Sequence, residues 1–142
     1  MTDNFNLNRF LDAQKNNYDF ALKEIRAGYK QSHWMWYIFP QIKGLGQSSE
    51  SKKFEIRSAE EAKSYLRHPI LGSRLIEITT AFLILPDKTA FEVFGGIDSL
   101  KMKSSMTLFA SVQNEIDVFS RVLCVYYMGD YCEFTRSQIE VN

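Results

Sequence analysis

The chain has 142 residues, of which 45% are hydrophobic and 14% aromatic, and this predicts one domain, residues 1–142, with a single core. Seventeen basic and seventeen acidic side chains give a formal net charge of zero. No overall electrostatic attraction therefore draws the protein to nucleic acid or to an anionic membrane, and neither partner is expected.

The N-terminal residues and the two cysteines bear on location and on metal binding. Residues 1–20 are polar and lack the basic and apolar regions of a secretory signal, so we expect a cytoplasmic protein. Cys124 and Cys132 have neither Cys-x-x-Cys spacing nor a neighbouring histidine. We expect reduced thiols and no metal site.

The first part of the chain predicts two helices and a loop. Apolar residues at helical spacing over residues 8–27, followed by Gly28, predict a first helix with a left-handed C-terminal residue. Ser32 is a suitable N-cap for a short aromatic helix that ends at Phe39, because the residue before a proline avoids the α region. Residues 44–51 are expected to form a loop.

The middle of the chain predicts a capped helix followed by a long one. Ser58 and Glu61 have the spacing of a capping box and begin a helix over residues 59–67. Pro69 is suited to the first position of the next helix. Its apolar stripe comprises Leu71, Leu75, Ile78, Phe82 and Leu85. Gly72 costs this helix roughly 1 kcal/mol relative to alanine, which indicates either close packing or the approach of a ligand.

The last part predicts three more helical segments and a final turn. Asp87 is expected to cap a short helix that ends at Gly95, and Asp98 precedes a segment of mixed helix and loop. Residues 116–127 predict a further helix, with a last turn after Thr135. Because strand alternation is nowhere sustained, the sequence predicts an all-α fold of six or seven helices around one core.

The most unusual segment contains both tryptophans of the chain. Trp34, Trp36 and Phe39 crowd around His33 and are followed by Gln41. Aromatic side chains with a few polar groups are typical of small-molecule sites, but the same residues are equally typical of dense core. Both interpretations remain open from sequence alone.

Basic residues near this segment are candidates for anion binding. Arg26, Lys30 and His33 are four and three positions apart, so a continuous helix would place them on one side, although Gly28 makes that continuity uncertain. They form either a solvated basic edge or a rim that holds a carboxylate or phosphate. Arg74 has the same two interpretations, because it can clamp a ligand or pair with an acidic residue.

Two glycine-containing segments supply further candidates. Gly44 and Gly46 permit close backbone approach beside Ser48, although a Gly-x-Gly alone is a weak motif. The segment after Gly95 concentrates hydroxyl groups and two lysines, which resembles an anion-binding turn. Its candidate ligand-binding residues are Lys101, Lys103, Ser104 and Ser105. Capping and turn formation explain the same serines without a ligand.

Known catalytic templates are absent from the sequence. There is no Gly-x-Ser-x-Gly elbow, Walker A sequence, His-Glu-x-x-His motif or dense acidic cluster. His33 is the candidate catalytic acid or base, because its reference pKa lies near ~6.5. Whether the protein is an enzyme stays open, and no cofactor is indicated.

Several segments together match a family pattern that extends over almost the whole chain. They include Ser32-His-Trp-Met-Trp36, Ile38-Phe-Pro-Gln41, Gly44-Leu-Gly46, His68-Pro69, Leu71-Gly72 and Ser104-Ser-Met-Thr-Leu-Phe109. In this combination the chain resembles the domain of unknown function 1810 family. The resemblance implies a single, mainly helical domain of bacterial type and no particular activity. The family usually has an acidic residue three positions after Gly129, where this chain has Cys132.

Two functional hypotheses follow from these patterns. The first is a pocket for a small anionic ligand, such as a nucleotide or an ADP-ribose-like molecule, with an aromatic wall and a basic rim. Its ligand-binding residues are Arg26, Lys30, Trp34, Trp36, Gln41, Ser48, Arg74, Lys101, Lys103, Ser104 and Ser105. The alternative is a non-enzymatic module that binds a protein partner through residues 33–41.

Overall fold

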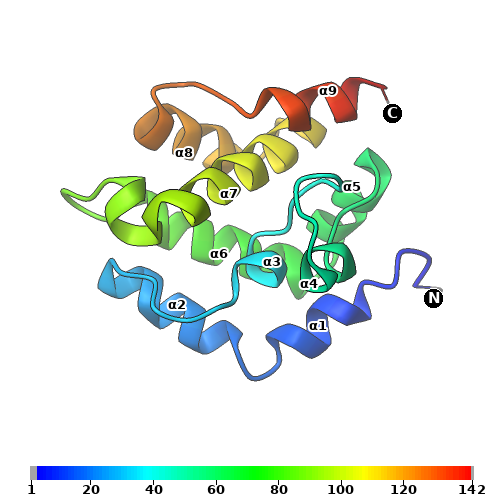
Figure 1. Cartoon of the computed structure of the whole chain (residues 1–142), viewed down its shortest axis with the longest axis horizontal. Helices are drawn as coiled ribbons and strands as arrows, with labels where there is room; N and C mark the ends of the chain where they lie inside the picture. Colours follow the sequence, from blue (N-terminus) through cyan, green and yellow to red (C-terminus); the bar gives the residue numbers. More distant parts are fainter. Residues whose placement is uncertain (1–2, 142) are drawn as a thin grey trace.

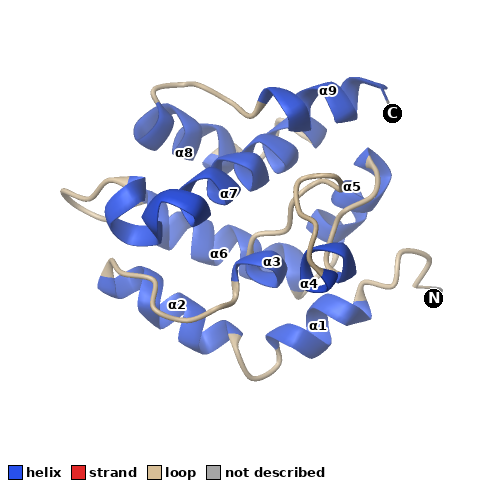
Figure 2. Ribbon diagram, in the orientation of Figure 1, coloured by secondary structure: helices blue, strands red, loops and turns tan. Residues whose placement is uncertain are grey.

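The computed structural model of the protein describes residues 3–141, which contain nine helices and no strand. The helices are α1 (Asn8–Gln14), α2 (Tyr18–Ala27), α3 (Met35–Ile38), α4 (Ser49–Lys53), α5 (Ala59–Arg67), α6 (Leu71–Leu83), α7 (Ala90–Val112), α8 (Val118–Tyr127) and α9 (Glu133–Val141). The all-α prediction is confirmed, but the predicted number of six or seven helices is too low (Figures 1 and 2).

Two local features account for most of the difference in helix number. The predicted helix over residues 8–27 is broken near Asn17, whose side-chain amide donates to the carbonyl of Ala13 at 2.8 Å. Such a side-chain bond competes with helix propagation. In addition, residues 44–51 are not all loop, because Ser48 caps α4 by accepting a hydrogen bond from the Ser51 amide at 3.1 Å.

Some predicted caps are correct and others are displaced. Gly28 ends α2 in the left-handed region with φ 83°, and the Ser58 hydroxyl accepts from the Glu61 amide at the start of α5. Asp87 is not the cap of the following helix, because Thr89 forms a complete capping box with Glu92. The predicted break at Gly95 is present as a non-helical residue inside α7.

The core lies around α6 and α7, which run through the middle of the molecule. Figure 1 shows α1 and α2 along one side and α8 and α9 along the other, with α6 and α7 between them. Aromatic pairs connect these layers: Phe39 and Phe82 each lie edge-on to Phe94, and Phe82 stacks on Tyr126. Within residues 3–141, no helix is long and apolar enough to cross a membrane.

Candidate functional site

A cavity of about 450 Å³ lies where the segment after α2, helix α3, the start of α4 and the middle of α7 meet. We call it the Trp36 cavity. It is lined by Lys30, His33, Met35, Trp36, Ser48, Ser49, Glu50, Asp98 and Lys101. Its residues come from segments as distant in the sequence as Lys30 and Lys101, so the fold creates this arrangement.

Glu24 on α2 holds the segment that carries His33 in place. Its carboxylate accepts hydrogen bonds from the amides of Gln31 and Ser32 at 2.7 and 2.9 Å and from the Ser32 hydroxyl at 2.6 Å. The Trp34 indole donates to the same carboxylate at 3.0 Å. Burial alone would raise the pKa of Glu24, but these hydrogen bonds outweigh it and lower the pKa to about 2.

The two tryptophans have different environments. Trp34 is only 1% exposed and packs against Phe39, with ring centroids 6.0 Å apart, so it belongs to the core. Trp36 is half-buried and lines the cavity, where Lys101 Nζ lies 4.4 Å from its ring centroid. A side chain on Gly46 would overlap the Trp36 ring, so this glycine permits the close approach of its loop.

Asp98 links the two lysines of the cavity. Its carboxylate lies 2.8 Å from Lys30 Nζ and 3.3 Å from Lys101 Nζ. Lys30 also donates to the Ser32 carbonyl at 2.5 Å, and its side chain is only 7% exposed. Lys101 is therefore the more available of the two cations, while Asp98 and Glu50 add acceptors to the lining.

The fold brings together five of the predicted site residues: Lys30, His33, Trp36, Ser48 and Lys101. The other predicted residues lie elsewhere. Arg26 lines a hollow beside the end of α6, Arg74 donates to Gln14, Lys103 and Ser104 line a hollow beside Cys132, and Trp34, Gln41 and Ser105 are buried. The single composite pocket of the sequence hypothesis is thus distributed over several parts of the molecule.

Three acidic residues that shape the site have no local sequence motif. Glu24 accepts hydrogen bonds from Ser32 and Trp34, which are eight and ten positions away, across the turn at Gly28. The sequence indicated Asp98 only as a helix cap, whereas its carboxylate pairs with the lysines. Glu50 lines the cavity from α4, a helix that the sequence did not predict.

Cys132 stands at the start of α9, where the family pattern usually has an acid. Its carbonyl accepts from the Arg136 amide, as an N-cap residue does, and its sulfur accepts from the hydroxyls of Ser104 and Thr135 at 3.4 and 3.2 Å. Burial raises the pKa of the Cys132 thiol, but these hydroxyls and the backbone amides of Thr135 and Phe134 outweigh burial and lower the pKa below its usual range. The sulfur therefore lies beside the first amides of α9, a position that suits the side chain of a helix cap and a carboxylate equally well.

Replacing Cys132 by aspartate should preserve the cap, and replacing it by alanine should remove it. We expect Cys132→Ala to lower the free energy of unfolding by about 1 kcal/mol. Cys132→Asp should stay within a few tenths of a kcal/mol of the natural chain or exceed it. Urea unfolding measures both, and Cys124→Ala on the exposed face of α8 is the matched control. An equal loss for the alanine and aspartate variants would contradict the capping role.

The described residues do not contain a group of three or more His, Cys, Asp or Glu side chains arranged to hold a metal ion. The chemistry available at the Trp36 cavity is that of two ammonium groups, an imidazole, an indole face, hydroxyl groups and two carboxylates. Such a set can bind and orient a small polar molecule and can exchange protons with it through His33.

Residues 3–141 thus form a small, all-helical domain with a polar cavity beside a half-buried tryptophan. The chain belongs to the family described as "Protein of unknown function (DUF1810)", whose sequence model matches residues 4–139. It is also similar to the conserved hypothetical protein Rv1873 from Mycobacterium tuberculosis, known from a crystal structure. The two share 41% sequence identity with a TM-score of 0.97, covering 99% of this chain and 100% of the other. A search of curated proteins finds no match.

Proposed function

We propose that the Trp36 cavity binds a small anionic ligand with a planar group, of the nucleotide or ADP-ribose type. The observation that carries this proposal is the position of Lys101 over the Trp36 ring, in a cavity of about 450 Å³ that also contains Lys30 and His33. A volume of this order is typical of small-molecule sites. An indole face beside an ammonium group suits a planar group attached to an anion.

Each polar group of the cavity has a role in this proposal. Lys101 pairs with the anionic group of the ligand, since it is the more exposed lysine. The Ser48 hydroxyl accepts from Ser51, so its own proton is free to donate to the anion. Glu50 accepts hydrogen bonds from hydroxyl groups of the ligand, such as those of a ribose, while Asp98 stays paired with the two lysines.

His33 is the group through which the cavity would carry out proton transfer. Its side chain is exposed at the cavity, while the hydroxyl of Tyr37 donates to its carbonyl at 3.4 Å. An imidazole exchanges its proton near neutral pH, and this suits general acid or base catalysis on a bound ligand.

Opposite effects of two substitutions test the sign of the ligand charge. We expect Lys101→Ala to weaken binding of ADP-ribose or AMP by tenfold or more, because a charge-assisted hydrogen bond contributes roughly 1.5–3 kcal/mol. Asp98→Asn should strengthen binding severalfold, because Lys101 and Lys30 lose their shared counter-ion. Isothermal titration measures both affinities.

Two controls separate binding from folding in this experiment. Lys23→Ala removes an exposed lysine on α2 outside the cavity and should leave the affinity unchanged. Urea unfolding of Asp98→Asn reports the cost of leaving the nearly buried Lys30 without its carboxylate. If Asp98→Asn weakens binding in a folded protein, or Lys101→Ala leaves it unchanged, the proposed anion site is wrong.

The alternative, a protein-interaction module built on residues 33–41, has less support. In that segment only His33 and Trp36 are not buried, so little apolar surface remains for a partner.

We also propose that the protein acts in the cytoplasm, since Cys124 and Cys132 are free thiols rather than a disulfide.

A further inference from the structure

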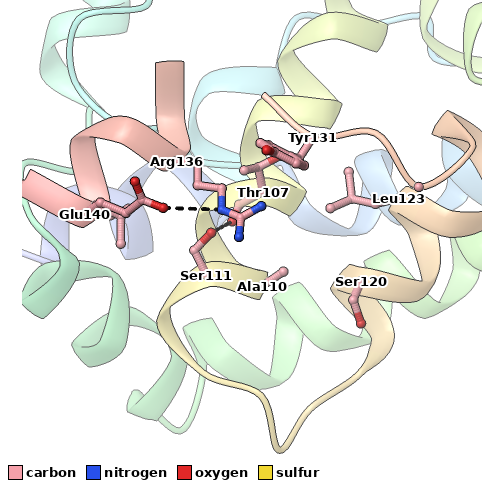
Figure 3. A pocket seen from close by; sticks show the side chains of 10 residues that line it. Thr107, Ala110, Ser111, Ser120, Leu123, Tyr131, Arg136 and Glu140 are labelled. Carbon is pink, nitrogen blue, oxygen red and sulfur yellow. Dashed lines mark hydrogen bonds and ion pairs between the residues drawn. The ribbon is translucent and has the colours of Figure 1, made fainter. Parts of the chain in front are cut away.

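A second cavity, of about 420 Å³, lies between α7, α8 and α9 and shares no lining residue with the Trp36 cavity. We call it the Arg136 cavity. Its polar lining consists of Thr107, Ser111, Ser120, Tyr131, Arg136 and Glu140 (Figure 3). Arg136 is the one cation of that lining, and Figure 3 shows its guanidinium group directed into the space between Ser111 and Tyr131.

Two neighbouring side chains, Tyr131 and Glu140, position the guanidinium group of Arg136. Its central carbon lies 4.4 Å from the centroid of the Tyr131 ring, and its Nε lies 3.5 Å from a carboxylate oxygen of Glu140. The Arg136 side chain is 49% exposed, and its only ion pair among the described residues is made through Nε, so its two terminal nitrogens are accessible to a ligand. A carboxylate fits these two nitrogens, because two parallel hydrogen bonds match the geometry of the guanidinium group.

The two serine hydroxyl groups of the cavity already donate their protons to backbone carbonyls. The Ser111 hydroxyl donates to the Thr107 carbonyl at 2.6 Å, and the Ser120 hydroxyl donates to the Asp117 carbonyl at 3.0 Å. What these two serines present to the cavity is therefore an oxygen that accepts hydrogen bonds. Glu140 adds a carboxylate, so the two serines and Glu140 all present hydrogen-bond acceptors to the cavity.

We propose that the Arg136 cavity binds a small amino carboxylate of the α-amino acid class. The carboxylate pairs with the terminal nitrogens of Arg136, and the ammonium group donates to Ser111, Ser120 or Glu140. A phosphate or sulfate suits the cavity less, because its oxygens only accept hydrogen bonds and would face the acceptors of both serines. Leu123 supplies apolar contact for the remainder of the ligand.

The test is a thermal-shift screen of the full chain with each common L-amino acid, and with acetate and methylamine as single-charge controls. At concentrations up to about 10 mM, at least one amino acid should give a saturable rise in Tm, while acetate and methylamine give none. No rise with any amino acid, or an equal rise with acetate, would overturn the proposal.

Substitutions then assign the binding to this cavity. For the amino acid that binds, we expect Arg136→Gln to lower the affinity at least tenfold and Ser111→Ala to lower it severalfold. Arg121→Ala, on an exposed position of α8 outside the lining, should change nothing. Lys101→Ala should also leave this affinity unchanged, because Lys101 belongs to the other cavity. Binding that survives Arg136→Gln, or that is lost with Lys101→Ala, would contradict the assignment.

Discussion

Replacing Gly72 by alanine is expected to destabilise the protein by about 3 kcal/mol, the upper part of the range for overpacked positions. A Cβ atom on Gly72 would overlap the carbonyl oxygen of Leu66 and lie only 2.8 Å from its carbonyl carbon. Because these are backbone atoms of α5, no side-chain rotation can relieve the overlap. The midpoint of urea unfolding should therefore fall sharply.

Gly96 provides the matched control for this substitution. It also lies in a helix, α7, but a Cβ atom there would lie 3.6 Å from the nearest atom, Phe91 Cε2, which is an ordinary contact. We expect Gly96→Ala to be neutral or to stabilise the protein by roughly 0.5–1 kcal/mol, since alanine restricts the unfolded chain. Equal losses at Gly72 and Gly96 would show that α5 and α6 are not in close contact.

Replacing Glu24 by glutamine is expected to lower the free energy of unfolding by about 2 kcal/mol near neutral pH. The carboxylate accepts from two backbone amides, the Ser32 hydroxyl and the Trp34 indole. Glutamine keeps one acceptor oxygen and turns an NH₂ group toward donors, so at least one of them loses its partner. Because the segment from Gln31 to Trp34 carries His33, the substitution should also weaken ligand binding at the Trp36 cavity.

The effect of Glu24 should depend on pH in a defined direction. Folding lowers the pKa of this carboxyl from its ordinary value near 4.5 to about 2, so the carboxylate stabilises the fold fully above 4.5. That stability is lost as the pH falls toward 2. The difference between the natural chain and Glu24→Gln should therefore shrink over this interval, whereas Glu115→Gln, at an exposed position, should show no such difference. A difference independent of pH would contradict the role of the charged form.

Helix boundaries set by neighbouring residues were predictable from the sequence. Gly28 ends α2 in the left-handed region, and Ser58 caps α5 through the Glu61 amide. Both depend on residues within one turn of the boundary, and the sequence pattern contains them. The break near Asn17 was missed because apolar periodicity continues through it, while a side-chain bond to Ala13 interrupts the helix.

The candidate site was only partly predictable, because its decisive contacts are not local. The sequence indicated an aromatic segment but could not distinguish the buried Trp34 from the half-buried Trp36. That distinction depends on Glu24, which binds the Trp34 indole, and on Gly46, which packs against Trp36. The pairing of Lys30 and Lys101 through Asp98 likewise depends on how α7 packs beside the segment after α2.

The two tryptophans allow a direct measurement of the proposed function, because the chain has no others. In a titration with ADP-ribose or AMP followed by ¹⁵N–¹H NMR, each indole gives its own signal. We expect a saturable shift of the Trp36 indole, which lines the cavity, and a much smaller shift of the Trp34 indole, which is buried and bonded to Glu24. If the Trp36 signal stays unchanged to concentrations of about 10 mM, or ligand shifts appear only at residues outside the cavity, the anion-binding function is wrong.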